Sequence, residues 1–376
     1  MISLKFLVNN ISNGNQLSRA NFQLIKAVIM THHQHIKILI LCTSLLCASS
    51  VGAKVTGNCS SCHTMHNSQN GSVVHCTQLH ESLLNSDCLG CHTGTNNGSN
   101  STPYVHSVHD LNDDGAAYGE SGIEGTTLAG GTFKYLTTED SYGHNVVGLG
   151  NADKTLFIPP GYSGGLPAAD STTPGDGNWP DGEQITCAGT YGCHGSHNST
   201  SNAMAIRGAH HQGGTGKIVP GSDTSPAAGY RMLVGIAGYE DSDWEYQPTS
   251  TAHNQYKGSD GTIDNSTISY LCAQCHGVFH DGSNGSPWLR HPSDFSMSRA
   301  TGSEYSSYTV YLPATPLAST EIPDSVTSDI TSGSSDIVTC LSCHRAHGSP
   351  YYKSMRWGYA ESSDGGLCIN CHTSKN

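Results

Sequence analysis

The chain has 376 residues, of which 35% are apolar, 12% are charged and 44 are glycine. The low charged fraction excludes a highly charged disordered tail, and the formal net charge of −13 argues against nucleic acid and anionic lipid as partners. So few large apolar side chains cannot bury enough surface to offset the entropy of ordering the chain. Something other than side chains has to supply the core.

The first residues in chain order predict an export signal. A short apolar run follows Lys37 and ends in small residues up to Ala53, which predicts a secretory signal peptide over residues 1–53, cleaved after Ala53. The run is too short to span a bilayer. The segment before it, residues 1–29, is unusually long for a signal peptide, so Met30 is an alternative start of the protein. We therefore expect a secreted protein with one domain over residues 54–376.

Pairs of cysteines that end in Cys-His recur along the predicted domain. Five of the pairs are strict CxxCH motifs, whereas the sixth, CAGTYGCH at 187–194, has five residues between its cysteines. The cysteines are Cys59, Cys62, Cys88, Cys91, Cys187, Cys193, Cys272, Cys275, Cys340, Cys343, Cys368 and Cys371. The histidines that follow them are His63, His92, His194, His276, His344 and His372. Cys76 is left without a partner.

A CxxCH turn has the chemistry of covalent haem attachment. Both thiols can add to the haem vinyl groups while the adjacent histidine binds the iron as the proximal ligand. Disulfides would not require a histidine after every second cysteine, and zinc sites would not use six such pairs. A thioredoxin-like dithiol lacks its strand-helix context here. We therefore predict six haem c groups, with a disulfide as the alternative for the wide motif at 187–194.

The remaining histidines exceed the six distal ligands that six irons need, whereas methionine is scarce. This excess predicts two histidine ligands at each iron, which gives lower potentials than His/Met ligation and leaves no open site for substrate. The candidate distal ligands are His66, His144, His197, His210 or His211, His253, His291 and His347. Weaker candidates are His75, His80, His106, His109 and His280.

Turn-forming residues dominate the stretches between the motifs, and these stretches lack helical or strand periodicity. We expect short helices at the Cys-His motifs and brief strands near GTFKYLTT (131–138) and YSSYTVYLP (305–313). The rest of the chain should be mostly irregular coil.

The motifs CSSCHTMHNSQNG, DCLGCHTGTN, LCAQCHGVFH and CLSCHRAHGSPYYKSMRWGY resemble those of exported multihaem c-type cytochromes of metal-reducing bacteria, the group with doubled CxxCH motifs. The resemblance includes outer-surface members that form filaments. It implies a multihaem cytochrome c fold, in which irregular coil with short helices and few strands surrounds a haem stack.

The same resemblance implies extracellular electron transfer through haems with two histidine ligands. Other cytochromes would be the electron donors, and metal oxides or other cells the acceptors. It also implies a homopolymeric filament in which one distal histidine comes from the next subunit. Because His75, His80 and His347 are near the ends of the haem-binding region, we expect the donor to be one of them.

Two alternatives remain open. A monomeric periplasmic electron shuttle would carry the same motifs as a filament subunit. A multihaem oxidoreductase would need one haem with an open axial position, but every motif here ends in histidine. We therefore expect an electron carrier and no catalytic residues.

Overall fold

The computed structural model describes residues 57–74, 80–107, 127–150, 158–162, 179, 183–212, 214–280, 293–300, 305–358 and 366–373. All of these lie in one compact unit, Gly52–Asn376. The predicted signal peptide, Cys76 and the candidate ligands His75, His109 and His291 lie outside the described residues. Within the described part of the chain, no helix has the length and apolarity needed to cross a membrane.

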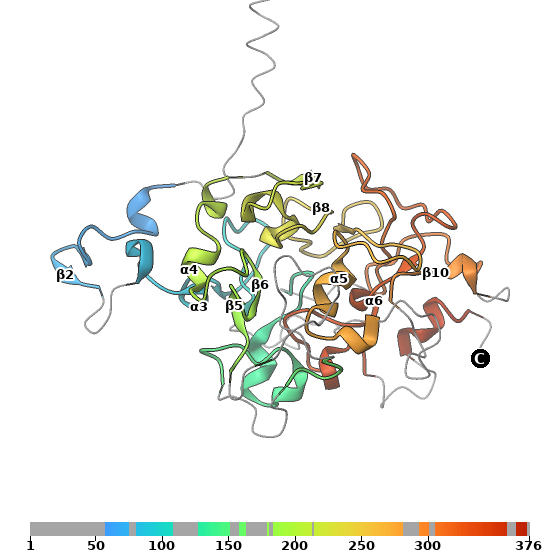
Figure 1. Cartoon of the computed structure of the whole chain (residues 1–376), viewed down its shortest axis with the longest axis horizontal. Coiled ribbons are helices and arrows are strands. Elements are labelled where there is room, and N and C mark those ends of the chain that lie inside the picture. The colour runs from blue at the N-terminus through green and yellow to red at the C-terminus, as the bar shows by residue number, and fades with distance from the viewer. Residues whose placement is uncertain are drawn as a thin grey trace, which may run out of the picture. The chain divides into compact units, whose positions relative to one another are not determined.

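Short elements separated by long irregular segments make up the described fold (Figure 1). The α-helices are α3 (Cys88–Cys91), α4 (Asn202–Ala205), α5 (Ile268–Ala273) and α6 (Cys340–Cys343). The 3-10 helices are η1 (Cys59–Ser61), η2 (Glu81–Leu83), η4 (Phe133–Thr137), η5 (Asp140–Tyr142), η6 (Ala209–His211), η7 (Pro226–Ala228), η8 (Tyr230–Met232), η9 (Gly277–His280), η10 (Met297–Arg299), η11 (Tyr352–Ser354) and η12 (Gly366–Asn370). This architecture agrees with the expected coil with short helices and few strands.

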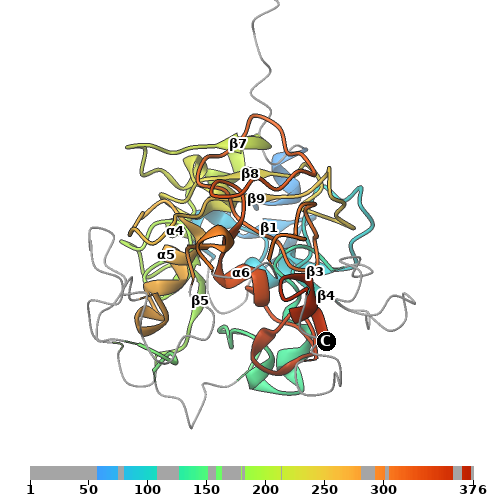
Figure 2. The same cartoon turned by 90° about the vertical axis from the view of Figure 1, so that its right-hand side faces the viewer.

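The strands form small separate sheets. They are β1 (Ser68–Gln69), β2 (Ser72–Val73), β3 (Thr93–Gly94), β4 (His106–Ser107), β5 (Thr186–Ala188), β6 (Gly192–His194), β7 (Gly216–Ile218), β8 (Gly238–Glu240), β9 (Gln255–Tyr256), β10 (Phe295–Ser296) and β11 (Ile337–Val338). The pairs β1-β2 and β10-β11 are antiparallel, whereas β3-β4 and β5-β6 are parallel. Strands β7, β8 and β9 form an antiparallel three-stranded sheet (Figure 2).

The five strict motifs contain short helical turns, as expected, but the wide motif does not. Residues 187–194 instead run through β5 and β6, with Ala188 opposite His194 in the parallel register. The three residues between these strands form a tight turn in which the Gly192 N–H donates to the Gly189 carbonyl at 3.0 Å. The extra residues of the motif therefore replace the helical turn with a loop between strands.

The two strand predictions were wrong. The 131–138 stretch forms η4, in which Phe133 and Leu136 are buried. The 305–313 stretch buries Tyr308 and Tyr311, and its strand-like pairing is limited to an isolated bridge at Val310. Phe133 and Leu136 are three apart, which is the spacing of a 3-10 turn rather than the two-residue period of a strand.

Apolar packing in the described residues is confined to small clusters. One cluster joins Tyr230, Leu233, Ile236, Tyr256, Ile268, Ala318 and Ile337. A second contains Phe133, Leu136 and Val146, and a third contains Met297, Tyr308 and Leu317. Leu271 and Leu341 pack on the first cluster and Cys371 on the third, so the cysteine motifs lie directly against this small core.

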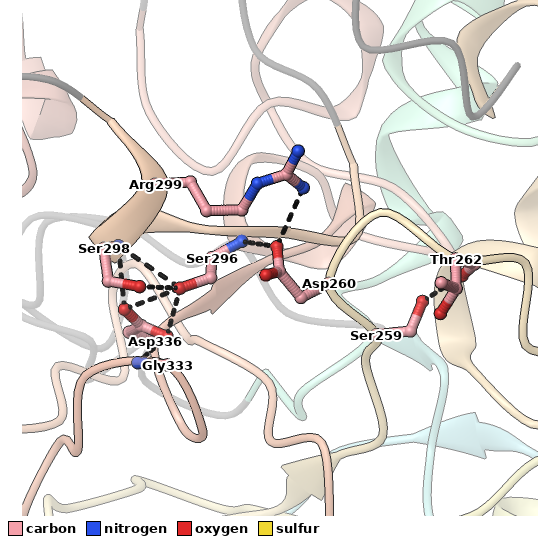
Figure 3. Close-up of polar contacts among 8 residues, drawn as sticks. All are labelled: Ser259, Asp260, Thr262, Ser296, Ser298, Arg299, Gly333 and Asp336. Atoms are coloured by element: carbon pink, nitrogen blue, oxygen red, sulfur yellow. Dashed lines mark hydrogen bonds and ion pairs between the residues drawn. The ribbon is translucent and has the colours of Figure 1, made fainter.

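Buried polar contacts fix the strand that leads into the fifth motif (Figure 3). Ser296 is fully buried, and its hydroxyl donates to the Asp336 carboxylate at 2.9 Å, while the Gly333 N–H donates to the same carboxylate at 3.0 Å. The Ser296 N–H donates to Asp260, which also pairs with Arg299 at 3.0 Å. These contacts tie β10 to β11, and α6 begins two residues after β11 ends.

Candidate functional site

Four of the motif histidines face a second histidine from a distant part of the chain. The ring centroids are 6.1 Å apart for His63 and His211, 6.3 Å for His92 and His210, 6.4 Å for His194 and His347, and 6.1 Å for His276 and His144. His344 and His372 are not in these pairs, and the ring of Tyr305 lies 5.4 Å from that of His372.

The spacing within these pairs is that of two imidazoles on opposite sides of one metal ion. A metal-to-imidazole bond is about 2 Å long and the ring centre lies about 1 Å behind the nitrogen, so two opposed ligands have centroids about 6 Å apart. Direct ring contact would be closer, as in the stack of His253 on Tyr311 at 3.6 Å. The four pairs therefore leave room for a metal ion between their rings.

Backbone carbonyls fix the orientation of five motif histidines. Their Nδ1 atoms lie 2.9 Å from the Ser82 carbonyl for His63, 2.7 Å from Pro103 for His92, 2.9 Å from Arg231 for His194, 2.6 Å from Pro160 for His276, and 2.9 Å from Lys353 for His344. A carbonyl only accepts, so Nδ1 must carry the proton. The Nε2 lone pair is then available for a metal. Metal-binding histidines usually donate their other ring N–H to a carbonyl in this way.

Burial keeps the paired imidazoles in the form that binds metal. Loss of solvent and, to a smaller extent, the nearby His144 lower the pKa of His276 to about 4. Burial likewise lowers the pKa of His347 to about 3, with His194 adding to the effect. A neutral imidazole is the ligating form, so these histidines need not lose a proton near neutral pH.

The motif cysteines are free thiols that lie beside the histidines. Burial raises the pKa of Cys275 and of Cys343 to about 12, and that of Cys371 to about 11. Zinc binds thiolates, and among the described residues no three or more His, Cys, Asp or Glu side chains converge as a metal cluster. Two thiols and one imidazole at each motif are the groups that covalent haem attachment uses.

Thiols of successive motifs lie next to one another in sequence order. The side chains of Cys88 and Cys187 are hydrogen-bonded, and so are those of Cys272 and Cys340. Three further thiols have a pKa that is raised by burial and also by a cysteine of an adjacent motif. Cys62 acts on Cys91, Cys193 acts on Cys275, and Cys371 acts on Cys343. Motifs one to six therefore form a continuous row.

The wide motif depends on glycine at its turn. Gly189 has φ +92°, and an added Cβ would lie 2.4 Å from the Ser199 carbonyl oxygen. The ring of His197 hydrogen-bonds to the backbone of Gly192 and Cys193. His197 therefore contacts the loop of its own motif and is not in one of the four pairs.

Other predicted histidines have different surroundings. His66 is exposed and has φ 54°. His253 stacks on Tyr311, and the Nδ1 of His106 lies 3.2 Å from the Thr93 hydroxyl.

His80 directly precedes η2, and the Nε2 of His280 lies 3.0 Å from Asp294. The sequence predicted either His210 or His211 as a ligand, whereas both take part in pairs. The turn η6 directs the ring of His211 toward His63 and that of His210 toward His92.

The C-terminal part of the chain has the sequence of a doubled CXXCH motif, since residues 333–376 match the family model with that description. In this segment the chain is similar to multihaem c-type cytochromes, as its motifs predict. Among solved structures it is similar to the Outer Membrane Cytochrome S filament from Geobacter sulfurreducens, with a TM-score of 0.47 and 19% identity over 86% of this chain and 100% of that chain. A second structure, of the OmcS nanowires from the same organism, gives a TM-score of 0.47 and 18% identity with the same coverage. No curated protein matches the chain.

Proposed function

We propose that the protein is an extracellular electron carrier that holds six haem c groups in a row, each with two histidine ligands. The observation that carries this proposal is the set of four histidine pairs at 6.1–6.4 Å, each with a Cys-His motif on one side. Bound haem supplies reversible one-electron chemistry at iron. The chain supplies the attachment points, the spacing and the axial ligands.

The proposed covalent sites are the twelve motif cysteines, and the proposed proximal ligands are the six motif histidines. The distal ligands are His211, His210, His347 and His144, opposite His63, His92, His194 and His276 respectively. The distal ligands for His344 and His372 come from the remaining candidates other than His106, which contacts Thr93 within the chain. The row of thiols in sequence order supports electron transfer from one motif to the next along the whole chain.

Intact-mass spectrometry of the exported protein tests the haem count. We expect a mass above that of the chain by six haem groups, including one at the wide motif. A variant with Cys187→Ala and Cys193→Ala should lose one haem and keep the others. A mass increase of five groups in the unmodified protein would remove the wide motif from the proposal.

We further propose that the protein polymerises with itself and passes electrons from other cytochromes to external metal oxides or cells. A shared ligand would join subunits directly. The ring of His347 lies 6.4 Å from that of His194 inside the chain, so we propose a different donor between subunits. His66 suits this role better, since it is exposed beside Met65 and near Val73, which are 75% and 63% exposed. A head-to-tail contact of this kind gives an open filament when it does not close by rotation.

Electron microscopy of material sheared from cells tests the assembly. Wild-type protein is expected as unbranched filaments, and His66→Ala as single particles that keep the same haem mass. His106→Ala is the matched control, since His106 contacts Thr93 within its own chain, and it should still form filaments. Discrete wild-type particles would leave the monomeric shuttle as the function. An open haem in those particles would instead favour the oxidoreductase.

A further inference from the structure

Three motif histidines contact the same unusual backbone feature. His63, His194 and His344 bond to the carbonyls of Ser82, Arg231 and Lys353. Each of these residues begins a pair of consecutive non-glycine residues with positive φ: Ser82–Leu83 (56° and 52°), Arg231–Met232 (48° and 64°) and Lys353–Ser354 (57° and 56°). We call these three pairs the left-handed clamps.

Each clamp makes a second contact with its motif. The N–H of the residue after the histidine donates to the carbonyl of the second clamp residue: Thr64 to Leu83 at 2.7 Å, Gly195 to Met232 at 2.8 Å, and Arg345 to Ser354 at 2.7 Å. The first carbonyl thus holds the ring and the second holds the backbone beside it. Three segments from different parts of the chain make the same two-point contact.

The motifs between these three use a different support. His92 bonds to the Pro103 carbonyl and His276 to the Pro160 carbonyl. Neither proline has positive φ. The clamp therefore occurs at the first, third and fifth motifs, and the prolyl carbonyl at the second and fourth.

Left-handed conformations are unfavourable for residues with a Cβ, and two in succession are rare outside glycine. Such strain persists only where the surroundings hold it, and it concentrates at functional sites. At the clamps the left-handed turn directs two successive carbonyls toward one motif. An ordinary turn would not present both carbonyls in this way.

We propose that the left-handed clamps are positioning elements that set the proximal imidazoles of alternate haem sites. This inference rests on the proposed function. By accepting the Nδ1 proton in a fixed direction, each clamp makes the imidazole a stronger donor to iron, which stabilises the oxidised haem and lowers its reduction potential. Ser82, Arg231 and Lys353 act through their histidines, and their side chains need not touch the haem.

Ser82 allows a clean test because it is exposed and uncharged. Ser82→Gly keeps the left-handed turn without strain, whereas Ser82→Val disfavours it because valine is β-branched. In the haem-loaded protein, we expect Ser82→Val to raise the reduction potential of one haem and to shift one set of low-spin electron paramagnetic resonance g-values. Ser82→Gly should leave both unchanged.

Gln247 provides the matched control, since it is exposed, has φ 48° and donates its side-chain amide to the Tyr246 hydroxyl. Gln247→Val introduces the same strain and should not change any haem potential. If Ser82→Val is produced poorly, Lys353→Val and Lys353→Gly repeat the comparison at His344, because both remove the same charge. If the valine and glycine variants have identical reduction potentials at both clamps, the inference is overturned. The proposed function still stands in that case if the mass shows six haems. Absence of haem at these motifs would overturn both.

Discussion

Replacing His347 by alanine is expected to convert one haem in six from low-spin to high-spin. The ring of His347 lies 6.4 Å from that of His194, and its loss would remove the distal ligand from that iron. The open position should bind carbon monoxide in the reduced protein, at about one sixth of the total haem. Absorption and electron paramagnetic resonance spectra measure the high-spin fraction directly.

Two variants make this result specific. His211→Ala should open a different iron to the same extent, since His211 faces His63. His106→Ala should leave the spectrum wholly low-spin, because the proposed ligand set does not include His106, whose Nδ1 lies 3.2 Å from the Thr93 hydroxyl. A His347→Ala protein that remains fully low-spin would show that another group binds the iron at His194, and the proposed pairing would then be wrong.

The chain without haem is expected not to fold. Its described apolar packing is limited to three small clusters, and a natural domain needs a net stability of about 5–15 kcal/mol after the entropy of ordering is offset. Porphyrin faces would supply the missing apolar surface, much as metal binding supplies folding energy in small metal-dependent domains. We expect a free energy of unfolding at or below zero for the haem-free chain.

Circular dichroism and limited proteolysis of protein made without haem attachment provide the measurement. The haem-free chain should give a disordered spectrum and rapid cleavage throughout residues 57–373, whereas the haem-loaded protein should resist cleavage. Cooperative thermal unfolding of the haem-free chain would contradict this expectation, since it would mean that the small clusters suffice.

The spacing of the motifs predicted the histidine on the cysteine side of each candidate site. It did not predict which histidine lies opposite. A Cys-His motif lies within one turn, so the sequence indicates His63 or His276 directly. The histidine that faces it is more than one hundred residues away in each of the four pairs. No periodicity in the sequence predicts such a contact, because the contact depends on the path of the irregular segments between the motifs.

The remaining differences come from contacts that outweigh local pattern. The wide motif became two short strands because five intervening residues exceed one helical turn. The 131–138 stretch became a 3-10 helix, and the Thr132 hydroxyl accepts the Lys134 N–H at 3.2 Å at its start. The left-handed clamps had no sequence signal, since serine, arginine and lysine do not favour positive φ.

Under the proposed function, the long separation within the histidine pairs would impose an order on maturation. Synthesis begins at the N-terminus, so His63 and His92 are made well before His210 and His211, which share the single turn η6. Haems attached to the first two motifs at that stage would each have one vacant coordination position, open to oxygen or peroxide. The arrival of η6 would close both positions together, so a chain stopped before residue 210 would carry two reactive irons rather than two inert ones.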